Sequence, residues 1–222
     1  MTEKQLRESV VNYLTQYIGI KEGSDEHKSI IKVFNDSHLC KRYSMTVYDS
    51  WCATAVSSAF IASGLVDIFP CVECSCSRMQ YYADQAGIWV EDDAYKPQIG
   101  DIVLYDWQDD GNGDCDGIPD HVGIVAEVKS KTFRVIEGNK NNTVGYRLMN
   151  VNSKYIRGFI TPNYSIVSSN SKTNKDIALE VIAGEWGNGE ERKKKLTEKG
   201  YDYSVIQRLV NQMIKESCNV SK

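Results

Sequence analysis

The first 85 residues predict four helices. Apolar residues recur every three or four positions in two stretches, and a third stretch is rich in Ala, Ser and Val without a breaking residue. Thr2 and Gln5 form a capping box at the start of the first stretch, and Gly19 ends it. The expected helices cover residues 2–17, 24–34, 52–62 and 77–85.

From Gly100 the pattern changes to short runs of β-branched and aromatic residues separated by turn signals, which is typical of strands. The expected strands cover residues 101–105, 121–126, 132–136, 145–148 and 157–160. Helices followed by a run of strands predict an α+β fold with an antiparallel sheet.

Residues 163–174 are rich in Ser, Asn and Thr and poor in apolar residues, a composition typical of a linker. Three short amphipathic segments with cap signals follow and predict three helices. We therefore expect a larger domain over residues 1–163, a linker over 164–174 and a three-helix unit over 175–215.

The composition, 41% hydrophobic and 25% charged residues, is that of a globular protein and excludes a disordered or membrane-embedded chain. The formal net charge of −4 gives no basic surface for nucleic acid, so we expect neither a nucleic-acid partner nor membrane insertion. The first residues lack the basic, apolar and small-residue blocks of a secretory signal. We expect synthesis in the cytoplasm.

One cysteine and one histidine stand out as candidates for chemistry. Cys52 opens the Ala/Ser-rich helix, where free N–H groups stabilise a thiolate and can bind a developing oxyanion. His121 opens a strand directly after an Asp-rich loop. Such a pair can perform nucleophilic catalysis, whereas a buried structural cysteine is the alternative interpretation. The cysteine count of seven is odd, and we expect most thiols to be reduced.

Four short motifs follow one another along the larger domain: YDSWCA at 48–53, PQIGD at 97–101, DHVGIV at 120–125 and IEGN at 136–139. In this order they resemble the CHAP family, the cysteine- and histidine-dependent amidohydrolases and peptidases of bacterial cell walls. The resemblance spans about residues 5 to 162. It implies a papain-like α+β fold.

The resemblance also implies the catalytic roles. Cys52 matches the nucleophile, His121 the general base, Glu137 the residue that orients the imidazole, and Asn139 a further polar residue beside it. Many relatives carry Gln just before the nucleophile, where this chain has Trp51. The backbone N–H of Cys52 is then the remaining expected oxyanion donor.

The loop from Asp106 to Asp120 holds six Asp residues, which repel one another unless water or a hard cation compensates them. Its spacing is similar to that of a calcium-binding loop, as in several CHAP relatives. The expected ligands of Ca²⁺ are Asp106, Gln108, Asp110, Asn112 and Asp114. A second register would use Asn112, Asp114, Asp116, Gly117 and Asp120. A solvated acidic turn is the alternative.

A cysteine cluster, Cys71-x-x-Cys74-x-Cys76, resembles half of a zinc motif. There is no second pair at zinc-finger distance, so the sequence favours a packed loop with free thiols over a metal site.

The C-terminal unit, from Asp176 to Asn211, is similar to the muropeptide-binding repeats of certain phage lysozymes. Trp186 and Tyr201 can stack on sugar faces, and Asn188 and Arg192 can reach hydroxyl and carboxylate groups. The alternative is that Trp186 and Tyr203 only fill a small core. A single repeat implies weak attachment unless the chain oligomerises, because avidity is missing.

The two resemblances together imply a peptidoglycan hydrolase, most simply a phage or prophage endolysin that acts on the cell wall after release. The bond that we expect it to hydrolyse is the one between N-acetylmuramic acid and L-alanine. The alternative is a bond in the stem peptide or the cross-bridge. A host or mobile-element protein with the same chemistry, an inactive wall-binding protein and a secreted toxin are the other interpretations.

Overall fold

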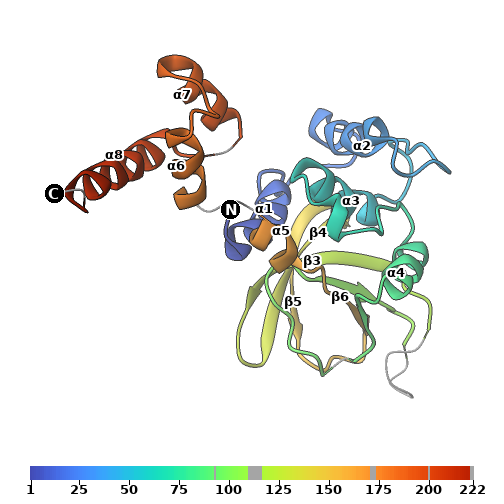
Figure 1. Ribbon diagram of the computed structural model, residues 1–222. Coiled ribbons are helices and arrows are strands. Elements are labelled where there is room, and N and C mark those ends of the chain that lie inside the picture. The colour runs from blue at the N-terminus through green and yellow to red at the C-terminus, as the bar shows by residue number, and fades with distance from the viewer. Residues whose placement is uncertain (93, 110–116, 171–173, 200, 221–222) are drawn as a thin grey trace. The chain divides into compact units, whose positions relative to one another are not determined.

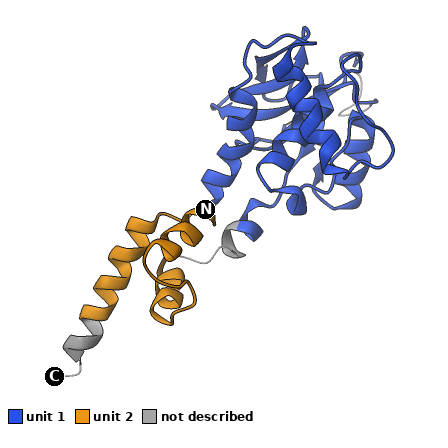
Figure 2. Cartoon of the chain, turned by 90° about the horizontal axis from the view of Figure 1, so that it is seen from above, with its two compact units in different colours: residues 1–168 blue, residues 169–222 orange. Residues whose placement is uncertain are grey.

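The computed structural model describes residues 1–92, 94–109, 117–170, 174–199 and 201–220. The chain divides into two compact units, residues 1–168 and 169–222 (Figure 2). Each has a hydrophobic core made of its own residues. In the described ranges, no helix is both long and apolar enough to cross a membrane.

The larger unit begins with helices, as the sequence predicts. They are α1 (Glu3–Thr15), α2 (Asp25–Ser37), α3 (Cys52–Ala62), the short 3-10 helix η1 (Val66–Ile68) and α4 (Cys76–Gln85). The capping box of Thr2 and Gln5 is present at the start of α1. Ser24 caps α2 by accepting a hydrogen bond from the backbone N–H of His27.

Six antiparallel strands follow, in the spatial order β1-β6-β2-β3-β4-β5 (Figure 1). They are β1 (Trp89–Val90), β2 (Ile102–Tyr105), β3 (His121–Val128), β4 (Thr132–Lys140), β5 (Thr143–Asn150) and β6 (Ile156–Ile160). The α+β expectation is confirmed. The sequence misses β1, because two residues are too few to form a pattern; its register with β6, Trp89 opposite Ile160, is set by tertiary pairing.

The sheet buries both faces, with alternate residues on opposite sides. Ile102 and Leu104 belong to the core under the helices, while Val103 and Tyr105 belong to a second core on the opposite face. Helices α1, α2 and α3 lie on one side of the sheet, as Figure 1 shows. Strand β2, buried on both faces, is therefore a continuous apolar run rather than a polar–apolar alternation.

Helix α3 approaches the sheet closely because the residues at their contact are small. A Cβ built on Gly138 of β4 would lie 2.4 Å from the Ala55 Cβ and 2.9 Å from the Trp51 ring. Every residue from Cys52 to Phe60 is buried. The Ala/Ser composition of α3 and the glycine of β4 together fix the depth at which the helix packs.

The larger unit continues beyond the boundary expected at residue 163. Residues Tyr164–Asn170, expected to be linker, form helix α5. Tyr164 is fully buried, and its hydroxyl donates a 2.7 Å hydrogen bond to the Gly100 carbonyl. The sequence does not reveal that Tyr164 is buried, because most of the residues around it are polar.

The smaller unit contains α6 (Asn174–Ile182), α7 (Gly189–Glu198) and α8 (Tyr203–Val220). Its buried core consists of Ile177, Ala178, Val181, Leu196, Ile206 and Val210. Asp202 caps α8, since its carboxylate accepts hydrogen bonds from the backbone N–H groups of Ser204 and Val205.

Candidate active site

The candidate nucleophile and base come from two different elements of the larger unit. Cys52 is the first residue of α3 and is 6% exposed. His121 is the first residue of β3, and its side chain is 12% exposed. The Cys52 thiol group and the His121 ring interact closely enough for each to shift the pKa of the other. The structure thus brings together two residues that lie far apart in the sequence.

Glu137 on β4 holds the imidazole from the other side. Its Oε2 lies 3.1 Å from His121 Nε2, and its Oε1 accepts a 2.7 Å hydrogen bond from Arg147 Nε on β5. Gly123 leaves room for Glu137, because a Cβ there would lie 2.7 Å from the Glu137 Cγ. With Nε2 occupied by Glu137, Nδ1 is the nitrogen left to exchange a proton with Cys52.

The charges of these groups favour a thiolate–imidazolium pair. Burial lowers the pKa of His121, but hydrogen bonds and charges of Cys52 and Glu137 outweigh it and raise the pKa to about 9. Burial opposes ionisation of Glu137, yet its bonds to His121 and Arg147 hold its pKa below the usual value. At neutral pH the imidazole therefore carries its proton between two anions.

Cys76, the first residue of α4, is a third member of the site that the sequence analysis missed. Its Sγ lies 3.8 Å from the Cys52 Sγ. Hydrogen bonding from Cys76, and then the hydrogen bond and charge of His121, lower the pKa of Cys52 well below its ordinary value despite burial. The hydrogen bond to Cys52 and burial raise the pKa of Cys76 well above it. Cys76 therefore stays protonated, and its thiol donates a hydrogen bond to the Cys52 sulfur.

The Ala53 backbone N–H also lowers the pKa of Cys52 and places the α3 N-terminus against the sulfur. The Trp51 side chain contributes no oxyanion donor: it is fully buried, and its indole N–H donates to Glu22 Oε2 at 3.1 Å. Its ring also contacts His27, with centroids 4.5 Å apart.

A stack of aromatic rings borders the base. Tyr105 stacks on His121 with centroids 5.8 Å apart, and Trp107 stacks on Tyr105 at 4.6 Å. The Arg147 guanidinium lies 4.6 Å from the centre of the Trp107 ring. Arg147 thus pairs with Glu137 and covers the ring stack that flanks His121.

Asn139 follows Glu137 on the same strand and is half-buried, with a φ of 57° in the left-handed region. It falls at an irregularity of the β4–β5 register between Glu137 and Lys140. The carboxylate that contacts His121 Nε2 is that of Glu137. The role of Asn139 stays a prediction.

Of the expected calcium ligands, the structure describes Asp106 and Gln108, while Asp110, Asn112 and Asp114 lie outside the described residues. Asp106 is 7% exposed, and its Oδ1 accepts a 2.9 Å hydrogen bond from the Gln108 backbone. Its Oδ2 faces Gly117: a Cβ built on Gly117 would lie 1.8 Å from this oxygen. The buried Asp106 carboxylate thus lies against the backbone of Gly117.

The four residues expected to bind the wall lie close together in the smaller unit. The Trp186 and Tyr201 rings meet edge to face with centroids 5.9 Å apart, and the Trp186 indole N–H donates to Glu180 Oε2 at 3.0 Å. Arg192 donates to Asn188 Oδ1 at 3.0 Å and to Gln207 Oε1 at 3.1 Å. Trp186 also lines a shallow hollow with Lys195 and Lys199 among others.

Two residues of the candidate site were not predicted, and they differ in whether the sequence contains a signal that could have identified them. Arg147 lies opposite Val135 and diagonally across from Glu137, so the strand register of a hairpin over 132–150 would have placed it on the Glu137 face. Cys76 had no such signal, because only the packing of α4 brings its sulfur to Cys52.

The antiparallel sheet, the helices packed on it and the cysteine at a helix start define a papain-like α+β unit followed by a helical one. Residues 43–139 match the family model of the CHAP domain, and residues 175–214 match that of the CW_7 repeat. The chain therefore carries a CHAP domain followed by a CW_7 cell-wall-binding repeat, which confirms both resemblances.

No curated protein matches the chain. A solved structure described as "The crystal structure of Ly7917" is similar at 15% identity and a TM-score of 0.35. The match covers 73% of this chain and 63% of that one, so this chain spans less than two thirds of its length.

Proposed function

We propose that the protein hydrolyses an amide bond of peptidoglycan through a covalent thioester on Cys52. The observation that carries the proposal is the continuous chain of contacts from Cys76 through Cys52, His121 and Glu137 to Arg147. Each contact favours the charged form that the chemistry needs. A buried structural cysteine, by contrast, would have its pKa raised by its surroundings, as Cys71 has.

The reaction proceeds in two steps. The Cys52 thiolate attacks the amide carbonyl, and the Cys52 backbone N–H donates to the oxyanion. His121 then gives its proton to the departing amine, the C–N bond breaks and a thioester remains. In the second step His121 takes a proton from water, which attacks the thioester, and the Cys52 thiolate leaves.

The first candidate for the cleaved bond is the amide between N-acetylmuramic acid and L-alanine. The second candidate is a peptide bond of the stem or of the cross-bridge. Mass spectrometry of fragments released from purified peptidoglycan distinguishes them. Free stem peptides that begin at L-alanine support the amidase, while cleaved stems still attached to muramic acid indicate an endopeptidase. The Cys52→Ala variant is the blank, and we expect it to release nothing while it still binds walls. Lysis by this variant would refute the mechanism.

We also propose that the loop starting at Asp106 binds Ca²⁺, with Asp106, Gln108, Asp110, Asn112 and Asp114 as ligands. The buried, loop-facing carboxylate of Asp106 supports this. Bound calcium would neutralise the acidic loop that leads to His121. EDTA is expected to lower the melting temperature and calcium to restore it, whereas Asp106→Asn should weaken the calcium response. An unchanged melting temperature would contradict the site.

The CW_7 repeat is proposed to hold the enzyme on the wall, through Trp186, Tyr201, Asn188 and Arg192. Its surface hollow beside Trp186 contains both acidic and basic side chains, which suits a muropeptide with hydroxyl and charged groups. We propose that the protein acts as an endolysin. Pull-down on purified walls tests the attachment, and Trp186→Ala is expected to reduce the bound fraction.

A further inference from the structure

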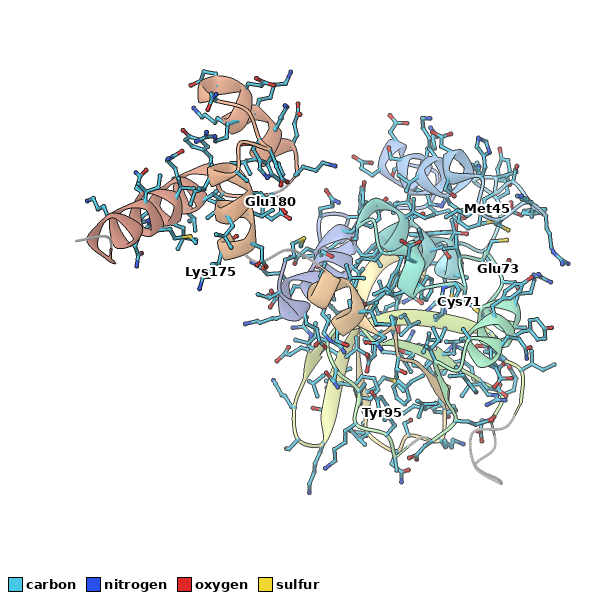
Figure 3. All side chains as sticks on the ribbon, in the orientation of Figure 1. Met45, Cys71, Glu73, Tyr95, Lys175 and Glu180 are labelled. Carbon is cyan, nitrogen blue, oxygen red and sulfur yellow. The ribbon has the colours of Figure 1, made fainter. Side chains whose placement is uncertain are left out.

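Away from the proposed catalytic site, two thiols and a carboxylate converge in the larger unit. Cys40 lies in the loop after α2, and Glu73 and Cys74 lie in the segment before α4. The three candidate ligand atoms all lie within 4.8 Å of one another. Figure 3 labels Glu73 and Cys71 in the segment that leads into α4.

The spacing of these atoms suits a tetrahedral metal. Cys40 Sγ lies 3.5 Å from Glu73 Oε2. Zinc with Zn–S bonds of about 2.3 Å and Zn–O bonds of about 2.0 Å sets sulfur and oxygen ligands about 3.5 Å apart. An ion at these two bond lengths from the sulfur and the oxygen therefore fits between them with little rearrangement.

Other contacts fix the carboxylate in the orientation that a ligand needs. Arg78 Nε donates to Glu73 Oε1 at 3.1 Å, which leaves Oε2 directed toward Cys40. The backbone of Glu73 is held on α3 by Ser57, whose Oγ donates to the Glu73 carbonyl at 2.8 Å and accepts from its N–H at 2.9 Å. Such second-layer bonds are what orient metal ligands in proteins.

Charge and softness favour zinc among divalent ions. Two thiolates and one carboxylate carry three negative charges, and Zn²⁺ together with the Arg78 guanidinium balances them. Thiolate sulfur selects zinc over calcium and magnesium, which require oxygen ligands. Glu73 is 5% exposed, whereas Cys40 and Cys74 are half-buried, so an ion has access from solvent.

We propose that Cys40, Glu73 and Cys74 form a zinc-binding site with water as the fourth ligand. The metal would tie the loop after α2 to the segment that ends at Cys76, the residue beside the nucleophile. This site is separate from the proposed hydrolysis, which uses Cys52 and His121. The sequence favours free thiols at Cys71, Cys74 and Cys76, because it offers no second pair at zinc-finger distance. Cys40 and Glu73 join Cys74 only in the folded chain.

Titration of the reduced full-length protein with Co²⁺, which takes the place of zinc, tests the proposal. We expect one equivalent to give sulfur-to-cobalt charge-transfer absorption and tetrahedral d–d bands, and one equivalent of Zn²⁺ to abolish them. Cys40→Ser and Cys74→Ser should each weaken zinc binding at least tenfold, and Glu73→Gln should weaken it as well. Circular dichroism verifies that each variant folds.

Two variants act as matched controls. Cys71→Ala removes a thiol from the same segment but outside the cluster, and Cys52→Ala removes the active-site thiol; both should bind zinc like the wild type. Loss of the cobalt spectrum in Cys52→Ala would move the metal to the active site and overturn the proposal. It is also overturned by zinc binding that survives Cys40→Ser, by the absence of any thiolate spectrum, or by a Cys40–Cys74 disulfide that persists under reduction.

Discussion

At the scale of single residues, the feature that organises the site is the completely buried carboxylate of Glu137. It is 0% exposed and is neutralised by His121 on one oxygen and Arg147 on the other. A buried charge without partners is strongly destabilising, so Glu137 requires both of them. This explains why an arginine that touches no candidate nucleophile still belongs to the site.

Glu137→Gln is expected to narrow the pH range of activity. With the carboxylate gone, burial pulls the pKa of His121 below about 9, and the imidazole loses its proton at a lower pH. The alkaline limb of the rate–pH profile should move down, and the rate at neutral pH should fall about 10²-fold or more. Glu127→Gln, which changes an exposed carboxylate on β3, is the control and should leave the profile unchanged. An unmoved alkaline limb would count against this role of Glu137.

Cys76→Ala is expected to raise the pKa of Cys52, because the thiol that donates to its sulfur is removed. Alkylation of Cys52 by iodoacetamide, followed peptide by peptide as a function of pH, measures this pKa directly. The midpoint should move to higher pH in Cys76→Ala and return toward the wild-type value in Cys76→Ser, whose hydroxyl also donates. Identical midpoints in all three proteins would mean that Cys76 is only a packing residue.

The sequence identifies the site residues whose surrounding motif is continuous and misses those defined by packing. Cys52, His121 and Glu137 each lie in a short motif, and the structure joins them as expected. Cys76 reaches the nucleophile through the placement of α4, a tertiary relation that spacing does not encode. Arg147 is an intermediate case, because strand register alone would have revealed it.

At the scale of secondary structure elements, the position of the nucleophile depends on how closely α3 packs on β4. The contact is made by Gly138, Ala55 and Trp51, with no space for another methyl group. The helix and strand patterns are visible in the sequence because their periods are local. The distance between them is not visible, since it depends on which small residues meet.

Gly138→Ala is expected to destabilise the larger unit by about 1–3 kcal/mol and to reduce catalysis, because the new Cβ would push α3 away from β4. Urea denaturation and the hydrolysis rate are the measurements. Gly145→Ala on the neighbouring strand is the matched control: its Cβ would meet nothing closer than 3.7 Å. Equal stabilities of the two variants would show that α3 can shift without penalty.

At the scale of the whole molecule, the chain is built from two units with separate cores. Composition located the division approximately, because residues 163–174 are mostly polar. It placed the end of the first unit too early, since one buried tyrosine among polar neighbours does not change the composition of the stretch.

Two truncations are expected to differ because of Tyr164. The fragment 1–168 should fold and hydrolyse soluble muropeptides while binding walls less well than the full chain. The fragment 1–163 lacks the buried Tyr164 ring and its bond to Gly100, and should be less stable by about 3 kcal/mol or more. Thermal melts of both fragments provide the comparison. If they melt together, the boundary belongs at residue 163 after all.

Two of the glycines that create space for the candidate site also help to recognise active relatives of this protein. Gly123 lies two residues after His121, and Gly138 directly follows Glu137. Under the proposed mechanism, a relative that hydrolyses peptidoglycan is expected to keep glycine at both positions together with the candidate catalytic side chains, whereas a relative without the activity is free to change all of them. Genomic surveys could therefore separate working enzymes from degenerate copies by inspecting positions 123 and 138 alongside the cysteine.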